Sequence, residues 1–292
     1  MDWALAAAGF GVGTIVGLTG MGGGALMTPI LVLFFGVPPL AAVSSDLVAS
    51  AIMKPVGSAV HIKRGRVDWR LVGWLCVGSV PAAFSGVLLS KALGNGVGVQ
   101  EVVRIALGVA LLLAVAGLVG RALVRMRSGV EEGGFQQVQA RPVATIVVGV
   151  VGGVVVGMTS VGSGSLIIVA LLALYPMLRP NDLVGTDLVQ AVPLVGAAAI
   201  GHVLFGDFQM HLTTSLLLGS IPGVFLGAQI SSRAPGGLIR WALAIVLLAS
   251  ALKLLHASNT QVVVGVAAAL AIGLLGWAGL RQPSVRRIVV GS

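Results

Sequence analysis

The chain has 292 residues, of which 57% are hydrophobic and only 9% are charged. Soluble domains carry about 25% charged residues, so this composition excludes an ordinary soluble protein. Forty-three glycines beside a single tyrosine argue against a transmembrane β-barrel, which needs girdles of aromatic residues. The net charge of +9 does not indicate nucleic-acid binding, because the basic residues gather in short segments between apolar blocks. The composition predicts an all-α polytopic membrane protein.

Apolar segments predict helices along the whole chain. They lie at about 3–19, 24–36, 43–62, 69–90, 102–122, 143–158, 164–177, 183–204, 210–231, 239–256 and 261–280. A helix needs about 20 residues to cross the hydrocarbon core, so 24–36 and 164–177 are too short. Each of these two follows a Gly-rich break, at Gly20–Gly24 and at Ser160–Gly164. We predict that the breaks are tips of helical hairpins or unwound points of discontinuous helices.

The two halves of the chain resemble each other. An offset of 141 residues places Asp46 over Asp187 and His61 over His202. Glycines and prolines coincide at the same offset: Gly65 with Gly206, Pro81 with Pro222, and Gly86 with Gly227. An offset of 140 places Gly17–Gly24 over Gly157–Gly164. Shared apolar composition does not explain coincident polar, glycine and proline positions, so they predict an internal repeat.

Basic residues orient the two halves. Lys63, Arg64 and Arg66 make one turn strongly basic and place it in the cytoplasm, whereas the matching turn Leu204–Asp207 has no positive charge. The repeats are therefore predicted to be inverted, with about seven full crossings plus two hairpins, an outside N-terminus and a cytoplasmic C-terminus. Inverted repeats with broken helices are typical of secondary transporters, which bind substrate near the midplane between the halves.

The predicted helices and the repeat also give the domain organisation. Residues 1–124 form the first inverted repeat and 142–257 the second, and a cytoplasmic linker at 125–141 joins them. Residues 258–292 add a further transmembrane helix and a basic C-terminal tail. The expected location is the cell inner membrane. Oligomeric state stays open, because small-residue faces such as Gly149–Gly153 can pack within one chain or between two.

The two Gly-rich breaks are the predicted substrate site. Glycine permits a tight non-helical turn, and the first N–H groups of the following short helix then point into the gap. These donors and the positive end of the helix dipole favour an anion. The candidate residues are Thr19, Gly20, Met21, Gly22, Gly23 and Gly24 in the first half, and Thr159, Ser160, Val161, Gly162, Ser163, Gly164 and Ser165 in the second. The alternative is that these glycines serve close helix packing.

Lys54 is the strongest single candidate for a substrate-binding residue. It lies near the middle of the apolar segment 43–62, too far from either end to reach the interface easily. A lysine at that depth costs about 2.5–3.5 kcal/mol on insertion scales, and such residues usually face an aqueous path or a partner. Its partner is either a substrate anion or a carboxylate such as Asp46. The repeat equivalent is Val195, so one positive charge would serve a roughly symmetric site.

Two acids, two histidines and one amide complete the candidates. Asp46 and Asp187 stand near the starts of matched segments, where they either cap helices or carry a coupled proton. His61 and His202 lie beside the turns, where an interfacial hydrogen bond and a proton relay are both consistent with the pattern. Gln190, one helical turn beyond Thr186, is a weaker candidate for facing the gap.

Motifs for other chemistries are absent from the sequence. There is no P-loop, no HExxH and no cysteine–histidine metal spacing, and Ser163 lacks both the strand-to-helix context of a nucleophile elbow and a triad partner. We therefore expect no enzyme activity, no metal and no cofactor, and we expect any transport to be driven by gradients.

Three stretches resemble the TauE/SafE family of sulfite and organosulfonate exporters: Gly17–Gly24, Gly36–Pro39 and His61–Trp69. The resemblance extends over nearly the whole chain. It implies a bacterial or archaeal inner-membrane permease for sulfur-containing anions such as sulfite, sulfoacetate or other sulfonates. The family pattern carries over to the Gly-rich tips and to the turn His61–Asp68, but not to Lys54. Members differ in substrate and direction, so the resemblance settles neither.

The repeat, the Gly-rich breaks, Lys54 and the family resemblance together predict a secondary transporter for a small sulfur-containing anion. We expect it to export the anion by alternating access around a midplane site, with proton coupling through Asp46, Asp187 or a histidine left open. The alternatives are an anion channel that uses the same site and a permease for another small anion such as thiosulfate or a carboxylate. A non-transporting membrane subunit would leave the repeat and the central lysine without a purpose.

Overall fold

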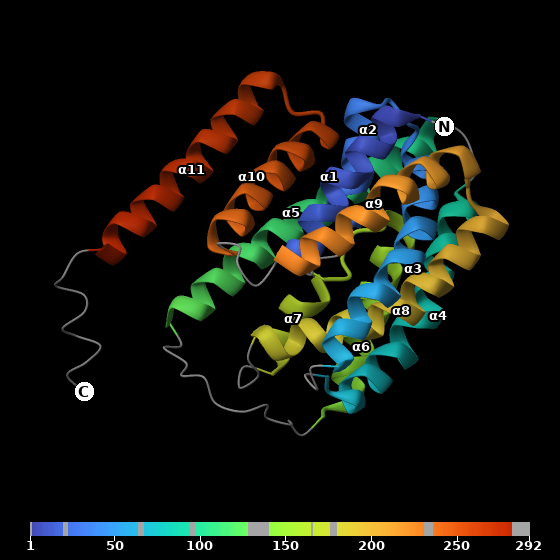
Figure 1. Ribbon diagram of the computed structural model, residues 1–292, viewed down its shortest axis with the longest axis horizontal. Helices are drawn as coiled ribbons and strands as arrows, with labels where there is room; N and C mark the ends of the chain where they lie inside the picture. The colour runs from blue at the N-terminus through green and yellow to red at the C-terminus, as the bar shows by residue number, and fades with distance from the viewer. Residues whose placement is uncertain are drawn as a thin grey trace.

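The computed structural model describes residues 2–19, 23–63, 67–93, 97–127, 140–164, 166–175, 180–230 and 236–281. In these ranges the secondary structure is helical throughout, which confirms the all-α fold (Figure 1). The helices are α1 (Trp3–Thr19), α2 (Gly24–Phe34), α3 (Pro39–Lys63), α4 (Trp69–Ala92), α5 (Val97–Arg127), α6 (Pro142–Thr159), α7 (Leu166–Leu174), α8 (Pro180–Phe205), α9 (Met210–Ile230), α10 (Gly236–Leu254) and α11 (Asn259–Arg281).

Each predicted apolar segment corresponds to one helix, with changes at the ends. The change that matters is at the two central helices: α3 begins at Pro39 rather than at 43, and α8 begins at Pro180 rather than at 183. α5 continues to Arg127, into the predicted linker. Residues 128–139 of that linker, the turn residues 64–66 and the tail 282–292 lie outside the described ranges.

Local sequence explains where several helices begin. Asp68 caps α4, because its carboxylate accepts the backbone N–H groups of Arg70 at 3.0 Å and Leu71 at 3.1 Å. α6 has Pro142 in its first turn, where the missing N–H of proline costs no hydrogen bond. α2 and α7 have 11 and 9 residues, so neither reaches the roughly 20 residues that a crossing needs.

Long apolar helices make this a multi-pass membrane protein. In the described part of the chain, five helical stretches are long and apolar enough to cross a membrane: Trp69–Ala92, Gly98–Gly120, Pro142–Thr159, Gly185–Phe205 and Met210–Gly227. The third of these is α6, the helix before the second break, which was predicted to be half of a hairpin or of a discontinuous helix. The count of seven crossings and the orientation of the termini stay predictions.

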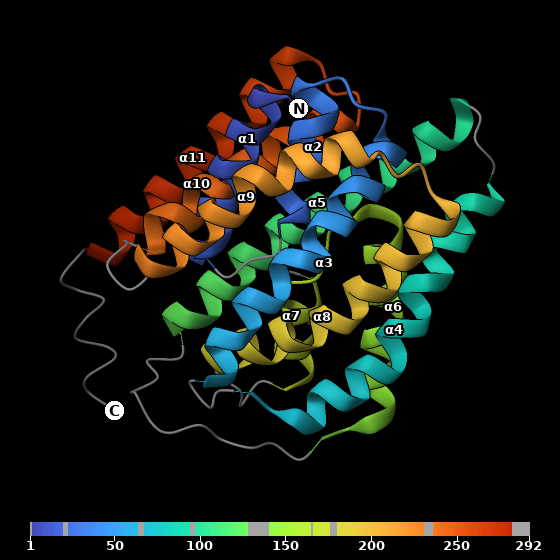
Figure 2. The ribbon, with the colours of Figure 1, turned by 45° about the vertical axis from the view of Figure 1, so that its right-hand side comes forward.

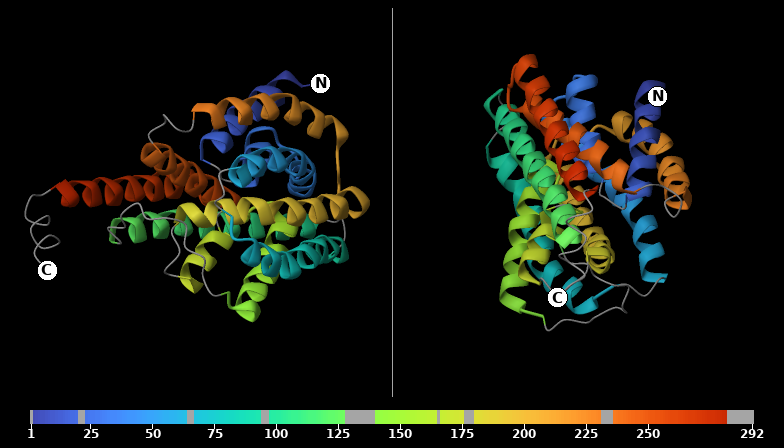
Figure 3. Two further views of the ribbon diagram at one scale, coloured as in Figure 1. Left: turned by 60° about the horizontal axis from the view of Figure 1, so that its bottom comes forward. Right: turned by 90° about the vertical axis from the view of Figure 1, so that its left-hand side faces the viewer.

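α3 and α8 occupy the centre of the molecule. They pack against each other, and each also contacts one of two flanking helix pairs: α3 contacts α9 of the pair α1–α9, and α8 contacts α4 of the pair α4–α6. Figure 2 shows α1 beside α9 and α4 beside α6. In the left view of Figure 3, α3 and α8 lie between the two pairs. Residues on α3 and α8 are therefore the ones that the fold places in the interior.

Glycines bring the helices of each flanking pair into backbone contact. A Cβ atom added to Gly13 of α1 would lie 2.5 Å from the carbonyl oxygen of Ser220 in α9. A Cβ added to Gly153 of α6 would lie at the same 2.5 Å from the carbonyl oxygen of Ser79 in α4. Without water to drive association, such close approach supplies the van der Waals packing that joins helices in a membrane. The small-residue face at Gly149–Gly153 thus packs within the chain.

The two pairs correspond residue by residue. Gly13 and Gly153 are related by the offset of 140, and Ser79 and Ser220 by the offset of 141. The contacts of the α1–α9 pair are thereby repeated in the α6–α4 pair. This correspondence agrees with an internal repeat whose halves exchange helices, and the inverted orientation of the halves stays a prediction.

Gly219→Ala tests the packing of the α1–α9 pair. The new methyl group would lie 1.8 Å from the carbonyl oxygen of Ala6, so the two backbones must separate. Overpacking of this kind costs about 1–3 kcal/mol, which predicts a clear fall in the midpoint of thermal unfolding. Gly196→Ala is the matched control, because nothing lies within 4 Å of its added Cβ. Equal unfolding midpoints for the two variants would contradict the close packing.

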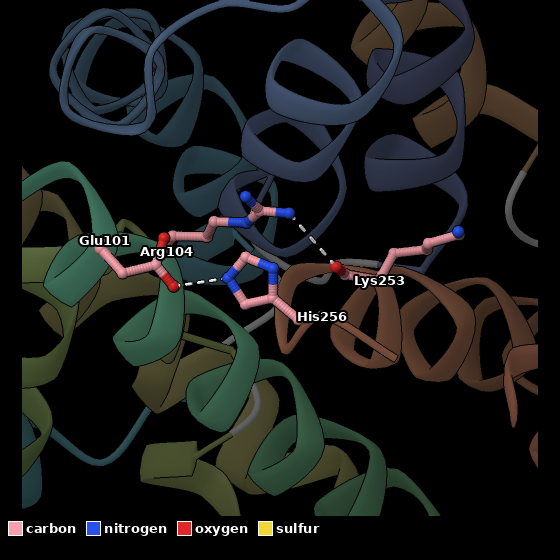
Figure 4. Close-up of polar contacts among 4 residues, drawn as sticks. All are labelled: Glu101, Arg104, Lys253 and His256. Carbon is pink, nitrogen blue, oxygen red and sulfur yellow. Dashed lines mark hydrogen bonds and ion pairs between the residues drawn. The ribbon is translucent and has the colours of Figure 1, made fainter. Parts of the chain in front are cut away.

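A polar cluster fastens the corner between α10 and α11 to the start of α5 (Figure 4). His256 Nε2 lies 2.5 Å from Glu101 Oε1, and Arg104 donates to the backbone oxygen of Lys253 at 3.5 Å. His256 has a φ of 62°, a left-handed conformation that ends the α10 segment and turns the chain into α11. The ion pair is half exposed, so we assign it no more than about 1 kcal/mol.

Candidate functional site

The two Gly-rich breaks meet inside the molecule. α2 begins at Gly24 directly after the first break, and a Cβ atom added there would lie 2.0 Å from the carbonyl oxygen of Ser160 in the second break. Ser160 has a φ of 59°, and Gly162 and Gly164 have φ values of 131° and 99°, so the chain leaves α6 through a left-handed turn. Gly20, Met21, Gly22 and Ser165, which the sequence analysis also named, lie outside the described residues.

Lys54 reaches the second break from α3. Its side chain is buried, with 8% exposure, and its Nζ donates to the hydroxyl oxygen of Ser163 at 2.5 Å. The ammonium also interacts electrostatically with two carboxylates, those of Asp187 and Asp46, and the interaction with Asp187 is the larger. The buried ammonium of Lys54 therefore contacts the glycine-rich segment between α6 and α7 and also interacts with two acids.

Asp46 does not cap a helix, so the interpretation of this residue as an N-terminal cap is wrong. α3 begins at Pro39, which places Asp46 two turns inside the helix, where its side chain is fully buried. Its Oδ2 accepts hydrogen bonds from the hydroxyl groups of Thr28 in α2 at 2.9 Å and of Ser160 at 2.7 Å. Asp46 therefore joins α2 and the second break to α3.

Asp187 is not a cap either, because α8 begins at Pro180. Its side chain is fully buried, and its Oδ1 accepts a hydrogen bond from Nε2 of Gln190 at 3.0 Å. The amide oxygen of Gln190 in turn accepts from the hydroxyl of Ser79 in α4 at 3.2 Å. Gln190 thus orients Asp187 and connects α8 to α4, and the structure does not place it at the contact between Lys54 and Ser163.

Thr159 and Val161 shape the second break. The hydroxyl of Thr159 accepts the backbone N–H of Val161 at 3.2 Å, which turns the chain back at the end of α6. The same hydroxyl lies 2.6 Å from the carbonyl oxygen of Val155, one turn earlier. Of Thr19, the counterpart of Thr159 in the first half, the structure describes only the backbone.

His202 is an interior residue rather than an interfacial one. Its ring is fully buried, with Nδ1 2.8 Å from the hydroxyl of Ser44 in α3 and Nε2 2.7 Å from the carbonyl oxygen of Gly157 in α6. A carbonyl oxygen only accepts, so Nε2 carries a hydrogen. Because both ring nitrogens have partners, the histidine joins three helices. The side chain of His61 lies outside the described residues.

His202→Phe is expected to lower the thermal stability of the protein. The phenyl ring fills similar space but leaves the Gly157 carbonyl and the Ser44 hydroxyl without this partner in the interior. An unsatisfied buried polar group costs about 1–3 kcal/mol, so the unfolding midpoint should fall by several degrees. Binding of anions by the remaining folded protein should persist. A stable variant that no longer binds would instead place His202 in the binding chemistry.

The structure adds residues that the sequence analysis missed. Ser50 and Ser58 lie on the same face of α3 as Asp46 and Lys54, because positions 46, 50, 54 and 58 follow each other at helical spacing. Ser58 donates to the backbone oxygen of Leu188 in α8 at 2.8 Å. This four-residue spacing of polar side chains in an apolar segment was the available signal. Thr28 gave no comparable signal, because only the fold brings it to Asp46.

An open apolar cavity lies between α3 and α9, where Val56, Ile221 and Phe225 are exposed. Its volume is about 320 Å³, and its lining consists of apolar side chains of α3 and α9: Met53, Val56, Ile221, Pro222, Val224 and Phe225. Met53 connects the cavity to the first break, because a Cβ atom added to Gly23 would lie 3.5 Å from its terminal methyl group. The lining itself contains neither Lys54 nor a described residue of the two breaks.

In the part of the chain that the structure describes, no three His, Cys, Asp or Glu side chains gather as a metal site requires. The site can therefore bind a ligand through hydrogen bonds and charge. The ammonium of Lys54, the hydroxyl of Ser163 and the start of α2 lie at the place where the two breaks meet. Such donors can bind a small anion.

Comparisons with known proteins show which family the chain belongs to. The family model of the sulfite exporter TauE/SafE matches residues 5–254. The probable membrane transporter protein YjnA of Bacillus subtilis (strain 168) is 37% identical over 248 residues, which cover 85% of this chain and 97% of that protein. YdhB of the same organism, also named a probable membrane transporter protein, is 23% identical over 226 residues, 77% of this chain and 89% of the relative.

A probable membrane transporter protein of Xylella fastidiosa (strain Temecula1 / ATCC 700964) is 27% identical over 225 residues, which cover 76% of this chain and 82% of that protein. No solved structure matches the chain. The family match extends from α1 to the end of α10 and leaves out α11. It therefore includes both breaks, Lys54 and both buried acids. The protein is a membrane transporter, and it belongs to the TauE/SafE sulfite exporter family.

Proposed function

We propose that the protein is a secondary transporter that exports a small sulfur-containing anion, such as sulfite, sulfoacetate or another organosulfonate, across the inner membrane. The anion binds where the two breaks meet, and alternating access exposes this site to one side of the membrane at a time. The observation that carries the proposal is the buried ammonium of Lys54 on the hydroxyl of Ser163, beside the contact between Gly24 and Ser160.

The energetic cost of Lys54 supports a function in binding. A charged lysine within a membrane-spanning bundle is expensive, and such residues usually mark a substrate or ion pathway. If its role were only to neutralise the two acids, apolar residues in place of all three charged side chains would stabilise the fold equally well or better. A cation that must be available to an anionic substrate explains why the charge is kept.

Backbone groups complete the proposed anion site. α2 and α7 begin at the two breaks. The first N–H groups of α7, those of Leu166 and Ile167, already donate to the carbonyl oxygen of Gly162, so the backbone donors that we assign to the anion are those of Gly24 and Ala25 at the start of α2. Gly23 and Gly24 on one side and Gly162 to Gly164 on the other allow these groups to approach a ligand closely. Because the three oxygens of a sulfonate or sulfite need several donors, this arrangement suits such an anion.

The adjacent cavity favours an organic substrate. It opens beside Met53, the residue before Lys54, and its apolar lining would receive the carbon chain of an organosulfonate while the sulfonate contacts the ammonium. The family description, sulfite exporter, supports a sulfur oxyanion and outward transport. We further propose an outside N-terminus and a cytoplasmic C-terminus, from the distribution of basic residues.

Ligand-dependent thermal stability tests the substrate class. The purified protein is heated with sulfite, sulfoacetate, methanesulfonate, thiosulfate or acetate at equal ionic strength. A ligand at a hundred times its dissociation constant stabilises the folded state by about 2.7 kcal/mol, so a true substrate should raise the unfolding midpoint by several degrees. We expect a shift with sulfite or a sulfonate and none with acetate. A shift with acetate alone would contradict the proposed substrate class.

Counterflow in liposomes separates a transporter from a channel. Liposomes loaded with unlabelled anion should accumulate labelled anion transiently, because a carrier exchanges one for the other through a single site. A channel only lets the two pools mix by diffusion. Uptake that neither saturates nor depends on the internal anion would identify a channel and contradict alternating access.

A further inference from the structure

We infer that Asp46 takes up one proton when the anion binds, so that the proton and the anion cross the membrane together. The inference rests on the proposed function and identifies its coupling ion. Two buried polar atoms of α3 support it. Oδ1 of Asp46 and the hydroxyl oxygen of Ser50 are both buried, neither makes a hydrogen bond of standard geometry among the described residues, and the two side chains lie close enough to interact.

One proton would satisfy both atoms. Ser50 stands one helical turn after Asp46, so the two side chains lie on the same face of α3. Oδ2 of Asp46 already accepts two hydroxyl donors, from Thr28 and Ser160. A proton bound at Oδ1 becomes a donor aimed at the one buried hydroxyl within reach on α3. The site is therefore built for a carboxyl group as well as for a carboxylate.

Charge balance supplies the reason for uptake. Without substrate, the ammonium of Lys54 faces the carboxylates of Asp46 and Asp187, which leaves one net negative charge. A bound monoanion would raise this to two negative charges inside the membrane, where uncompensated charge is very costly. Transfer of one proton from water to Oδ1 of Asp46 restores the original charge. No bond other than this O–H bond forms.

Asp46 fits this role better than the other titratable candidates. Oδ1 of Asp187 already accepts a hydrogen bond from the amide nitrogen of Gln190, which only donates and cannot receive a proton donor, whereas the hydroxyl of Ser50 beside Asp46 can accept one. His202 is held between Ser44 and the Gly157 carbonyl, and it lies on α8 rather than at the breaks.

Other elements packed on α3 add no competing charge at the breaks. α2 and residues 160–164 contain no ionisable side chain. His211 at the start of α9 is exposed, and Glu101 and Arg104 of α5 contact the α10–α11 corner. Lys54 is therefore the charged group that Asp46 faces.

A proton fits the two atoms better than a sodium ion does. A metal cation of this kind needs several oxygen ligands around it, as the six to eight of a calcium site illustrate. Oδ1 of Asp46 and the Ser50 hydroxyl supply two. The expected consequence is that binding and transport depend on pH and do not depend on sodium.

Proton uptake on binding tests the inference directly. Methanesulfonate is the probe, because its sulfonate stays ionised and releases no proton of its own. Calorimetric titration of the purified protein in two buffers of different ionisation enthalpy gives the number of protons taken up per anion. We expect about one proton, and an affinity that falls by up to about tenfold for each pH unit on the alkaline side.

Variants locate the proton. Asp46→Asn resembles the protonated acid, so it should bind methanesulfonate without proton uptake and with an affinity that no longer changes with pH. Ser50→Ala removes the hydroxyl that faces Oδ1 and should shift the pH dependence of binding. Ser90→Ala is the matched control, because Ser90 also has a buried hydroxyl without a partner among the described residues, and it lies on α4. This control should behave like the unchanged protein.

The outcomes distinguish this inference from the proposed function. Binding by the unchanged protein without proton uptake would overturn the inference alone, as would proton uptake that persists in Asp46→Asn or binding that requires sodium. If Asp46→Asn does not fold, equal pH dependence of Ser50→Ala and Ser90→Ala overturns it. If methanesulfonate, sulfite and sulfoacetate all fail to bind, the proposed function and the inference fail together.

Discussion

Lys54→Ala is expected to weaken the binding of sulfite and sulfonates by about ten- to a hundredfold, because hydrogen bonds to a charged group contribute about 1.5–3 kcal/mol. The ammonium is the one positive charge that the structure places against the second break. Its removal takes away the counter-charge of the bound anion and leaves both buried acids. The measurement is the binding isotherm of methanesulfonate, with the folded fraction checked by size-exclusion chromatography.

Lys91→Ala is the matched control for this change. Lys91 ends α4, where its ammonium lies over the ring of Phe205 at 4.3 Å from the centroid and its side chain is exposed. The same charge is lost, but away from the breaks, so binding should stay within about twofold. If Lys54→Ala folds and binds as tightly as Lys91→Ala, Lys54 is not part of the anion site.

Gly24→Ala should abolish anion binding and lower stability, since it forces the two breaks apart. The added methyl would lie 2.0 Å from the carbonyl oxygen of Ser160 and 2.5 Å from its hydroxyl oxygen, which donates to Asp46. Backbone atoms cannot move away as easily as the end of a flexible side chain. We therefore expect the free energy of unfolding to fall by about 1–3 kcal/mol, or more. Thermal unfolding and methanesulfonate binding measure the two effects.

Gly11→Ala is the matched control for Gly24→Ala. Gly11 lies on α1, and nothing stands within 4 Å of an added Cβ there. Alanine favours a helix over glycine by about 1 kcal/mol, so this variant should be as stable as the unchanged protein or more so. A Gly24→Ala protein that binds and unfolds like Gly11→Ala would show that the breaks do not need their close contact.

The structure distinguishes Gly23 from Gly24, the two adjacent glycines of the first break. Both Gly23 and Gly24 belong to the predicted site, and sequence alone gives no reason to prefer one. In the structure a methyl on Gly23 meets side-chain atoms alone, of Met53 at 3.5 Å and of Ser50 and Val16 at 3.8 Å, and all three are ordinary contacts. The same methyl on Gly24 meets backbone. Gly24 is therefore the more sensitive position.

The helices could be predicted from the sequence because hydrophobicity and length alone decide what crosses a bilayer. Each apolar segment became one helix, and the short segments after the breaks became the short helices α2 and α7. Helix ends were less predictable. α3 and α8 both begin at prolines, upstream of the predicted starts, because proline fits the first turn of a helix. That shift moved Asp46 and Asp187 from presumed caps into the interior.

The candidate site was only partly visible in the sequence. The Gly-rich breaks and Lys54 stood out because glycine clusters and a central lysine are unusual in apolar segments. The partners of these residues come from distant positions: Thr28 and Ser160 reach Asp46 from α2 and from the end of α6. Which hydroxyl meets which carboxylate depends on how α3 and α8 pack, and a single sequence does not contain that information.

The position of a bound anion tests the central claim most directly. A structure of the protein with 2-bromoethanesulfonate would locate the bromine by its anomalous signal. We expect the sulfonate within hydrogen-bond distance of the Lys54 ammonium and of the Ser163 region, with the bromine toward the apolar cavity beside Met53. An anion found instead at the Arg104–Lys253 corner, or at any place away from the two breaks, would contradict it.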